Sequence, residues 1–185
     1  KNNFLCAEEG GFGRIDQEVL GRIDKESGLI LLPHFGGRLS PVVNGNAKGV
    51  LYGLTLDCDK FDIARSVMES VAYLLRENLE LLETIDVRSR DVISLGGAAK
   101  SPVWQQIKAD VCDRNIISLK DGESTALGCA LNAGMAVGLL KEKEIPSLIY
   151  PKATYLPNSN RRVAYDQKFV EYKRLNRCLG YDDSI

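Results

Sequence analysis

The residues best suited to chemistry lie in a short glycine segment, Gly96-Gly97-Ala98, which follows an apolar stretch at residues 92–95. Glycine lets a backbone approach a ligand closely, because no side chain stands in the way. Ser101 and Pro102 are residue types favoured at the cap and first position of a helix, whose free amides and positive end attract an anion. This order of elements is therefore suited to binding a phosphate group.

The glycine segment does not match the two most common nucleotide-binding motifs. It lacks the Gly-Lys-Ser/Thr ending of a P-loop, and it lacks the third spaced glycine of a dinucleotide-binding fingerprint. Glycines at such a turn also occur where close packing alone requires them. The spacing by itself therefore leaves a ligand-binding role and a purely structural role open.

Other residue types that could do chemistry have simpler explanations. His34 is the single histidine and stands beside a proline and a phenylalanine, which is typical of a partly buried hydrogen-bonding residue. Asp57, Asp59 and Asp62 could be acid–base or metal-binding carboxylates, but a cluster at the start of a helix explains them with fewer assumptions. We therefore expect no catalytic residue and no metal ligand in this chain.

The elements that position the glycine segment follow from the hydrophobic pattern. Residues 64–82 carry apolar side chains at spacings of three and four, which predicts a helix capped by Asp59 or a neighbour. Residues 92–95 and 116–119 predict strands, and the helix that begins at Ser101 lies between them. A strand, a helix and a strand with short links predict a right-handed crossover and a parallel pair of strands.

Further elements are expected on both sides of this unit. Residues 28–35 predict a strand buried on both faces, because their apolar run is continuous. Residues 124–140 predict a helix rich in small side chains and capped by Ser124. Residues 150–160 predict an extended passage without regular period, and an amphipathic helix is expected over residues 162–179.

Composition limits the class of protein. The 185 residues, 44% of them hydrophobic, suffice for one good core and not for two large domains. Because 24 basic and 25 acidic side chains are mixed along the chain, no electrostatic footprint for nucleic acid or an anionic membrane exists. No apolar run is suited to spanning a bilayer, and five separated cysteines fit reduced thiols. We expect a cytoplasmic protein.

Several segments, taken in order, resemble the FGGY carbohydrate kinases, and specifically the C-terminal domain of xylulokinase-like members. Residues 49–69 resemble the second family signature, which is long and specific, and residues 94–104 resemble the adenosine motif. The remaining matches cover nearly the whole chain. They are residues 32–37 (Leu-Pro-aromatic segment), 46–49 (Asn-Ala-Arg-Gly), 126–131 (connecting helix) and 155–173 (closing helix).

The resemblance implies an α/β fold: an actin-, hexokinase- and ribonuclease H-like ATPase lobe, with a mixed sheet flanked by helices, as the C-terminal half of a two-lobe kinase. It implies that Gly96, Gly97, Ala98 and Ser101 contact ATP, with the adenine between neighbouring helices. The implied reaction is in-line transfer of the γ-phosphate from ATP with Mg²⁺ to a sugar hydroxyl. A pentulose such as xylulose is the expected substrate; glycerol, another polyol or another ketose are alternatives.

Two departures from the family pattern matter. The Gly-Asp motif that carries the family's catalytic aspartate has no counterpart here, because Asp16 and Asp24 stand in helical or exposed contexts. We therefore expect the catalytic base in an N-terminal lobe, and we expect this chain alone to be inactive. The loop at residues 37–41 reads Gly-Arg-Leu-Ser-Pro where xylulokinase-like members have Gly-Glu-Arg-Thr-Pro, which leaves the pentulose specificity open.

The expected organisation has two parts. Residues 1–145 form the nucleotide-binding lobe, incomplete at its N-terminal side, and residues 146–185 form an extended segment and a helix that pack back toward the missing N-terminal lobe. A homodimer is one arrangement that the sequence allows. The alternative from a different class of protein is a non-catalytic module that binds a nucleotide or a partner without turnover.

Overall fold

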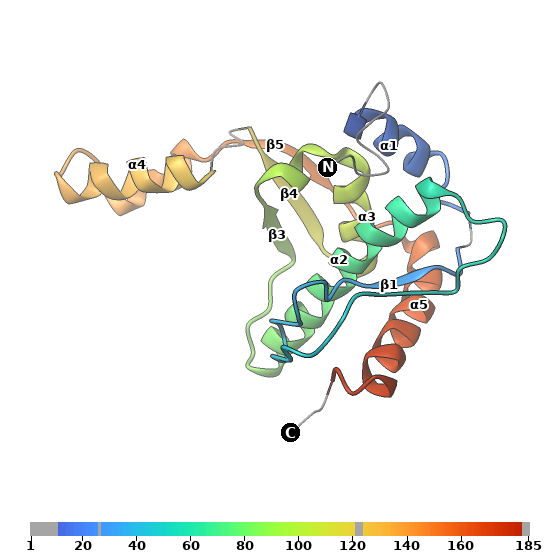
Figure 1. The fold of residues 1–185 in the computed structure, drawn as a ribbon. Coiled ribbons are helices and arrows are strands. Elements are labelled where there is room, and N and C mark those ends of the chain that lie inside the picture. The colour runs from blue at the N-terminus through green and yellow to red at the C-terminus, as the bar shows by residue number, and fades with distance from the viewer. Residues whose placement is uncertain (1–10, 26, 121–123, 183–185) are drawn as a thin grey trace.

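The computed structural model describes residues 11–25, 27–120 and 124–182. Figure 1 shows helices packed around the strands in one body, with α4 (Ser124–Ala136) extending away from it. The helix α1 (Gly11–Leu20) lies at one end of this body, close to α2 (Lys60–Thr84). Among the described residues, no helix is long and apolar enough to cross a membrane.

Three strands form a sheet in the order β3-β4-β5. The strands β3 (Asp91–Ser94) and β4 (Asn115–Leu119) are parallel, with Val92 opposite Ile116, which confirms the predicted parallel pair. The strand β5 (Pro151–Tyr155) is antiparallel to β4, so the sheet is mixed. No described strand pairs with the outer edge of β3.

The strand β5 lies inside the passage that the sequence predicted only as extended. Its residues Lys152 to Tyr155 alternate exposed polar and half-buried apolar side chains, but the run is short and none of its side chains is buried, so the sequence alone does not single it out as a strand. The strand forms because its backbone pairs with β4, a long-range contact that the local pattern does not encode.

The helix α2 begins where the aspartates predicted it. Asp59 is its N-cap and accepts hydrogen bonds from the backbone nitrogens of Phe61 (2.8 Å) and Asp62 (3.0 Å). The Asp62 carboxylate in turn accepts from the Asp59 nitrogen at 3.0 Å, which completes a capping box. The interpretation of these two aspartates as a helix-start cluster is therefore confirmed, and the helix extends beyond the predicted residues 64–82.

The hydrophobic core lies among α2, α3 (Pro102–Cys112), α5 (Ser159–Cys178) and β1 (Ile30–Leu32). All three residues of β1 are buried, as predicted, although the strand is shorter than the predicted residues 28–35. The strand β1 pairs antiparallel with β2 (Val50–Tyr52). Large aromatic side chains from α2 and α5 pack together in this core. They are Tyr73, Tyr165, Phe169 and Tyr172.

The segment from residue 146 onward belongs to this same packed unit. The strand β5 joins the sheet and α5 contributes to the core, so residue 145 is not a boundary within the described fold. Packing of α5 against another lobe stays a prediction.

The helix α4 ends at Ala136, earlier than the predicted residue 140. None of its described side chains is buried, although the helix is rich in apolar and small residues. The predicted cap by the Ser124 side chain, and the loop at residues 121–123, lie outside the part of the chain that the structure describes.

Candidate functional site

The glycine turn connects the end of β3 to α3. Gly96 has φ 80° and ψ −166°, a conformation that is essentially restricted to glycine. The short 3₁₀ helix η1 (Gly97–Lys100) follows, and Ser101 then caps α3 by accepting a hydrogen bond from the Trp104 nitrogen at 3.2 Å. No atom lies within 4 Å of a Cβ built on Gly96 or Gly97, so the turn borders open space.

A cavity of about 700 Å³ opens on one side of this turn. It lies between α1, α2 and the start of α3, and most of its lining is apolar. Three of the four predicted nucleotide contacts line it, namely Gly97, Ala98 and Ser101. A cavity with apolar walls and a few polar groups at one end suits a planar ring carrying polar substituents.

Asp16 is a polar group of this cavity that the sequence did not connect with the turn. Its Oδ1 accepts a hydrogen bond from the Ser101 hydroxyl at 2.8 Å, across 85 positions of sequence. Burial raises the pKa of Asp16, and the hydrogen bond from Ser101 acts in the opposite direction. The carboxylate thus fixes the Ser101 side chain, which also caps α3.

A second, smaller cavity of about 240 Å³ borders the same turn at the C-terminal ends of β3 and β4. Gly96 lines it, together with Lys100, Lys120 and Lys152. Three ammonium groups beside a glycine turn favour a polyanion. Neither Lys120 nor Lys152 was predicted as a site residue from the sequence. Lys152 reaches this cavity because it lies on β5, which was not predicted as a strand.

A buried lysine lies behind the turn. The Lys108 ammonium is almost fully buried and donates to the Ser94 hydroxyl at 3.2 Å. Burial lowers the pKa of Lys108, because the charged form is poorly solvated there. This group adds to the positive character of the end of β3.

The remaining candidate residues do not join the site. His34 is buried and its Nε2 lies 2.8 Å from the Asn176 Oδ1, so its interpretation as a hydrogen-bonding residue is confirmed. Asp24 is exposed, as expected. Within residues 11–25, 27–120 and 124–182, no group of three or more His, Cys, Asp or Glu side chains could hold a metal ion.

The sequence profile of the FGGY family of carbohydrate kinases, C-terminal domain, matches residues 16–137. The chain belongs to this family. The FGGY match includes the glycine turn and the helices α2 and α3 beside it. The mixed sheet flanked by helices agrees with the predicted fold class.

Relatives of this FGGY domain include xylulose and glycerol kinases. The chain is 30% identical to the xylulose kinase of Escherichia coli (strain K12) over 152 residues, which cover 80% of the chain and 31% of that kinase. It is 36% identical to the glycerol kinase of Deinococcus radiodurans over 129 residues, 69% of the chain and 26% of that enzyme. The chain thus spans about a third or less of the length of these relatives.

A solved structure confirms the fold. The crystal structure of xylulose kinase from Rhodospirillum rubrum superposes with a TM-score of 0.79 at 24% identity, covering 94% of this chain and 35% of that one. The α/β fold of an FGGY C-terminal lobe, inferred from the resemblance, is therefore correct. The roles of Gly96, Gly97, Ala98 and Ser101 as nucleotide contacts stay predictions.

Proposed function

We propose that this chain is the ATP-binding part of a carbohydrate kinase that transfers the γ-phosphate of ATP to a sugar hydroxyl. The observation that carries the proposal is the open glycine turn between two cavities of different character. The apolar cavity beside Gly97 would hold the adenine and ribose, and the lysine-lined cavity beside Gly96 would lie near the phosphates.

The chain's own residues would bind and orient the nucleotide. Backbone amides at the glycine turn would donate hydrogen bonds to the phosphates. The Ser101 hydroxyl, which Asp16 holds at the edge of the apolar cavity, would lie near the ribose. Mg²⁺ is proposed as part of the Mg-ATP substrate, in which it would offset the charge on the phosphates. The catalytic base is assigned to an N-terminal lobe that completes the cleft.

The proposed substrate is a pentulose such as xylulose, which the xylulose kinase relatives support. The glycerol kinase relative supports a polyol as the alternative. A panel of xylulose, other ketoses and glycerol, assayed on a protein with both lobes, distinguishes these substrates. The described cysteines are free thiols, which is compatible with the cytoplasmic location that we propose.

The first prediction tests nucleotide binding at the turn. Replacement of Gly97 by Leu should weaken ADP binding at least about 10-fold, because the new side chain would occupy space that the nucleotide needs. The fold should tolerate the change, since no atom lies within 4 Å of the added Cβ. Binding can be followed through Trp104, the single tryptophan, which lines the apolar cavity.

Gly36→Leu is the matched control, because Gly36 also borders open space and lies outside both cavities. It should bind ADP as the unmodified chain does. Equal ADP affinity in Gly97→Leu and the unmodified chain, measured by calorimetry, would place the nucleotide elsewhere.

A further inference from the structure

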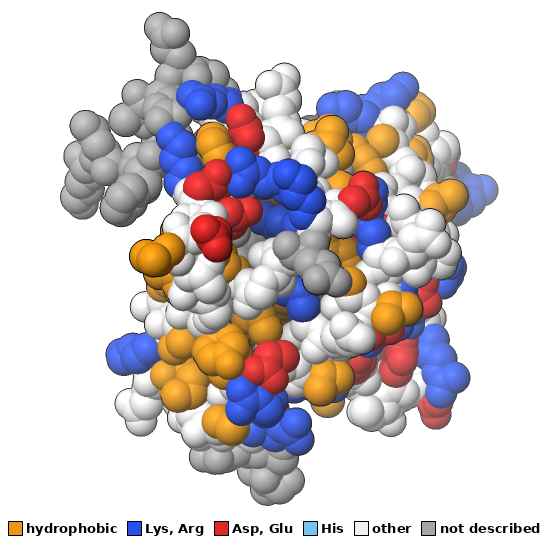
Figure 2. Space-filling model, turned by 90° about the vertical axis from the view of Figure 1, so that its right-hand side faces the viewer, with side chains coloured by type: hydrophobic (Ala, Val, Ile, Leu, Met, Phe, Trp, Pro, Cys, Tyr) orange, Lys and Arg blue, Asp and Glu red, His pale blue; other side chains and the backbone are white. Residues whose placement is uncertain are grey.

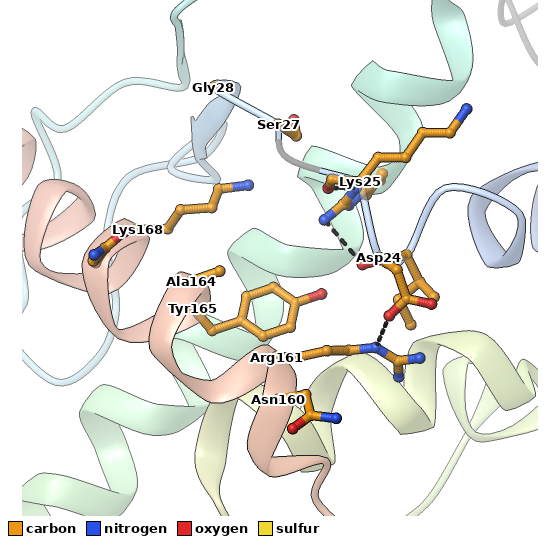
Figure 3. Close-up of a pocket in the computed structure, with 12 residues that line it drawn as sticks. Asp24, Lys25, Ser27, Gly28, Asn160, Arg161, Ala164, Tyr165 and Lys168 are labelled. Atoms are coloured by element: carbon orange, nitrogen blue, oxygen red, sulfur yellow. Dashed lines mark hydrogen bonds and ion pairs between the residues drawn. The ribbon is translucent and has the colours of Figure 1, made fainter.

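A third cavity, of about 520 Å³, lies away from the glycine turn, between the α1–β1 connection and the first turns of α5. Figure 2 shows this side of the molecule, where Lys and Arg side chains gather beside acidic ones. Figure 3 shows the side chains that line the cavity, among them Arg161, Tyr165 and Lys168 from α5 and Asp24 and Ser27 from the connection.

Two cations of the cavity are held in place by buried carboxylates. The Arg161 Nη1 lies 3.0 Å from the Oδ2 of Asp110, whose side chain is fully buried. The Lys168 ammonium pairs with Glu69, which is also buried. Because each carboxylate approaches from the protein interior, both cations are fixed in position at the wall of the cavity.

A third cation, Arg65, closes the inner wall. Its Nη1 donates to the carbonyl oxygens of Arg22 (2.5 Å) and Lys25 (2.8 Å), and its Nε donates to Glu69 at 2.7 Å. These bonds hold the α1–β1 connection against α2 through a buried guanidinium, and Glu69, which also pairs with Lys168, links this wall to α5.

Among the described residues, the Tyr165 hydroxyl makes no hydrogen bond of normal geometry, and its proton has no acceptor. Tyr165 is only 2% exposed, and in Figure 3 its ring points across the cavity between Arg161 and the connection. Burial raises the pKa of this phenol, so its proton is retained as a hydrogen-bond donor. The positive charge of the neighbouring Arg65 interacts with the phenol oxygen and acts to lower its pKa. A buried donor without an acceptor costs free energy, and a ligand oxygen would remove that cost.

The outer side of the cavity is closed by a weak contact. Asp24 accepts a hydrogen bond from the Arg161 Nε at 2.6 Å, but the Asp24 side chain is 75% exposed. Exposed ion pairs contribute little to stability, so a ligand with higher negative charge could replace Asp24 at Arg161. Among the residues that the structure describes, the cavity lining also carries four cationic side chains: Lys25, Arg65, Arg161 and Lys168.

We propose that this cavity binds a phosphate group, as the free ion or as a small phosphate monoester, with Arg161 and Lys168 as its ionic partners and the Tyr165 hydroxyl as a donor. The phosphate takes the place of the Asp24 carboxylate at Arg161. The volume left beside the phosphate accommodates the organic part of a monoester. This assignment does not depend on the proposed kinase function.

The test is calorimetric titration of the 185-residue chain with inorganic phosphate and, separately, with ribose 5-phosphate, at constant ionic strength set by chloride. Tyr165→Phe should weaken binding about 10-fold through loss of one hydrogen bond to a charged group. Its folding stability should change little, because the proton of the hydroxyl that it removes has no acceptor among the described residues. Asp24→Asn should strengthen binding several-fold, because it removes the competing carboxylate.

Two controls separate this cavity from the lysine-lined one. Lys152→Gln changes the other cavity, and it should leave the effects of Tyr165→Phe and Asp24→Asn intact. Tyr165→Phe should in turn leave the ADP response of Trp104 unchanged. Tighter binding of ribose 5-phosphate than of phosphate would identify a monoester as the ligand, and equal binding would identify the free ion. The proposal is overturned if neither probe binds, or if both variants match the unmodified chain.

Discussion

Glu77 is a buried side chain whose ionisation links stability to pH. Its carboxylate lies 3.1 Å from the Arg38 Nη2, and both side chains are almost fully buried. Burial raises the pKa of Glu77 from 4.5 to about 7, while the charge of Arg38 acts in the opposite direction. The folded protein therefore binds this proton more tightly than the unfolded chain. The stabilisation is complete below about pH 4.5 and is lost as the pH rises through 7.

Replacement of Glu77 by Gln tests this linkage at the residue scale. The free energy of unfolding of the unmodified chain, minus that of Glu77→Gln, should decrease as the pH rises from 5 to 8, because only the unmodified chain releases the proton. Urea denaturation at several pH values measures the difference. Parallel pH profiles for the two proteins would show that Glu77 has the same pKa in the folded and unfolded states.

At the scale of the elements, the start of α2 depends on one side chain. Asp59→Ala removes the N-cap, half of the capping box and an ion pair with Arg22, and should lower the free energy of unfolding by about 1–2 kcal/mol. Asp57→Ala is the control, because Asp57 is exposed and does not cap the helix. A loss of equal size in both variants, measured by urea denaturation, would contradict the capping role.

The helix α4 should be the least protected described helix in amide hydrogen exchange. None of its described side chains is buried, so its opening exposes little additional apolar surface. Its amides should exchange orders of magnitude faster than those in the buried part of α3, measured by mass spectrometry. Protection of α4 comparable to that of α3 would mean that another surface covers the helix in solution.

Elements with a strong local period could be predicted from the sequence, and contacts between distant segments could not. The helix α2 and the parallel strands β3 and β4 have clear apolar patterns, and Ser101-Pro102 has the chemistry of a helix start. The partnership of Asp16 with Ser101 depends on how α1 packs, which no local pattern encodes. The same holds for Lys152, which reaches the turn only through the pairing of β5 with β4.

At the scale of the whole molecule, we expect the 185-residue chain to bind ADP without turnover. The chain spans only 26–31% of the relatives described above, and the catalytic base is assigned to the N-terminal lobe that completes the cleft. Addition of xylulose or glycerol to the chain and Mg-ATP should not raise ADP release above the buffer rate in a coupled assay. Sugar-stimulated turnover by the purified chain would contradict the assignment of the base to another lobe.

The unpaired outer edge of β3 bears on how the chain behaves in concentrated solution. Its backbone amides and carbonyls have no described strand beside them, and the Ile93 and Leu95 side chains on or next to it are about half exposed. Such an edge is a template for pairing with a strand of another molecule. Purified samples should therefore self-associate with rising concentration, and a charged side chain placed at Ile93 should improve their solubility during storage.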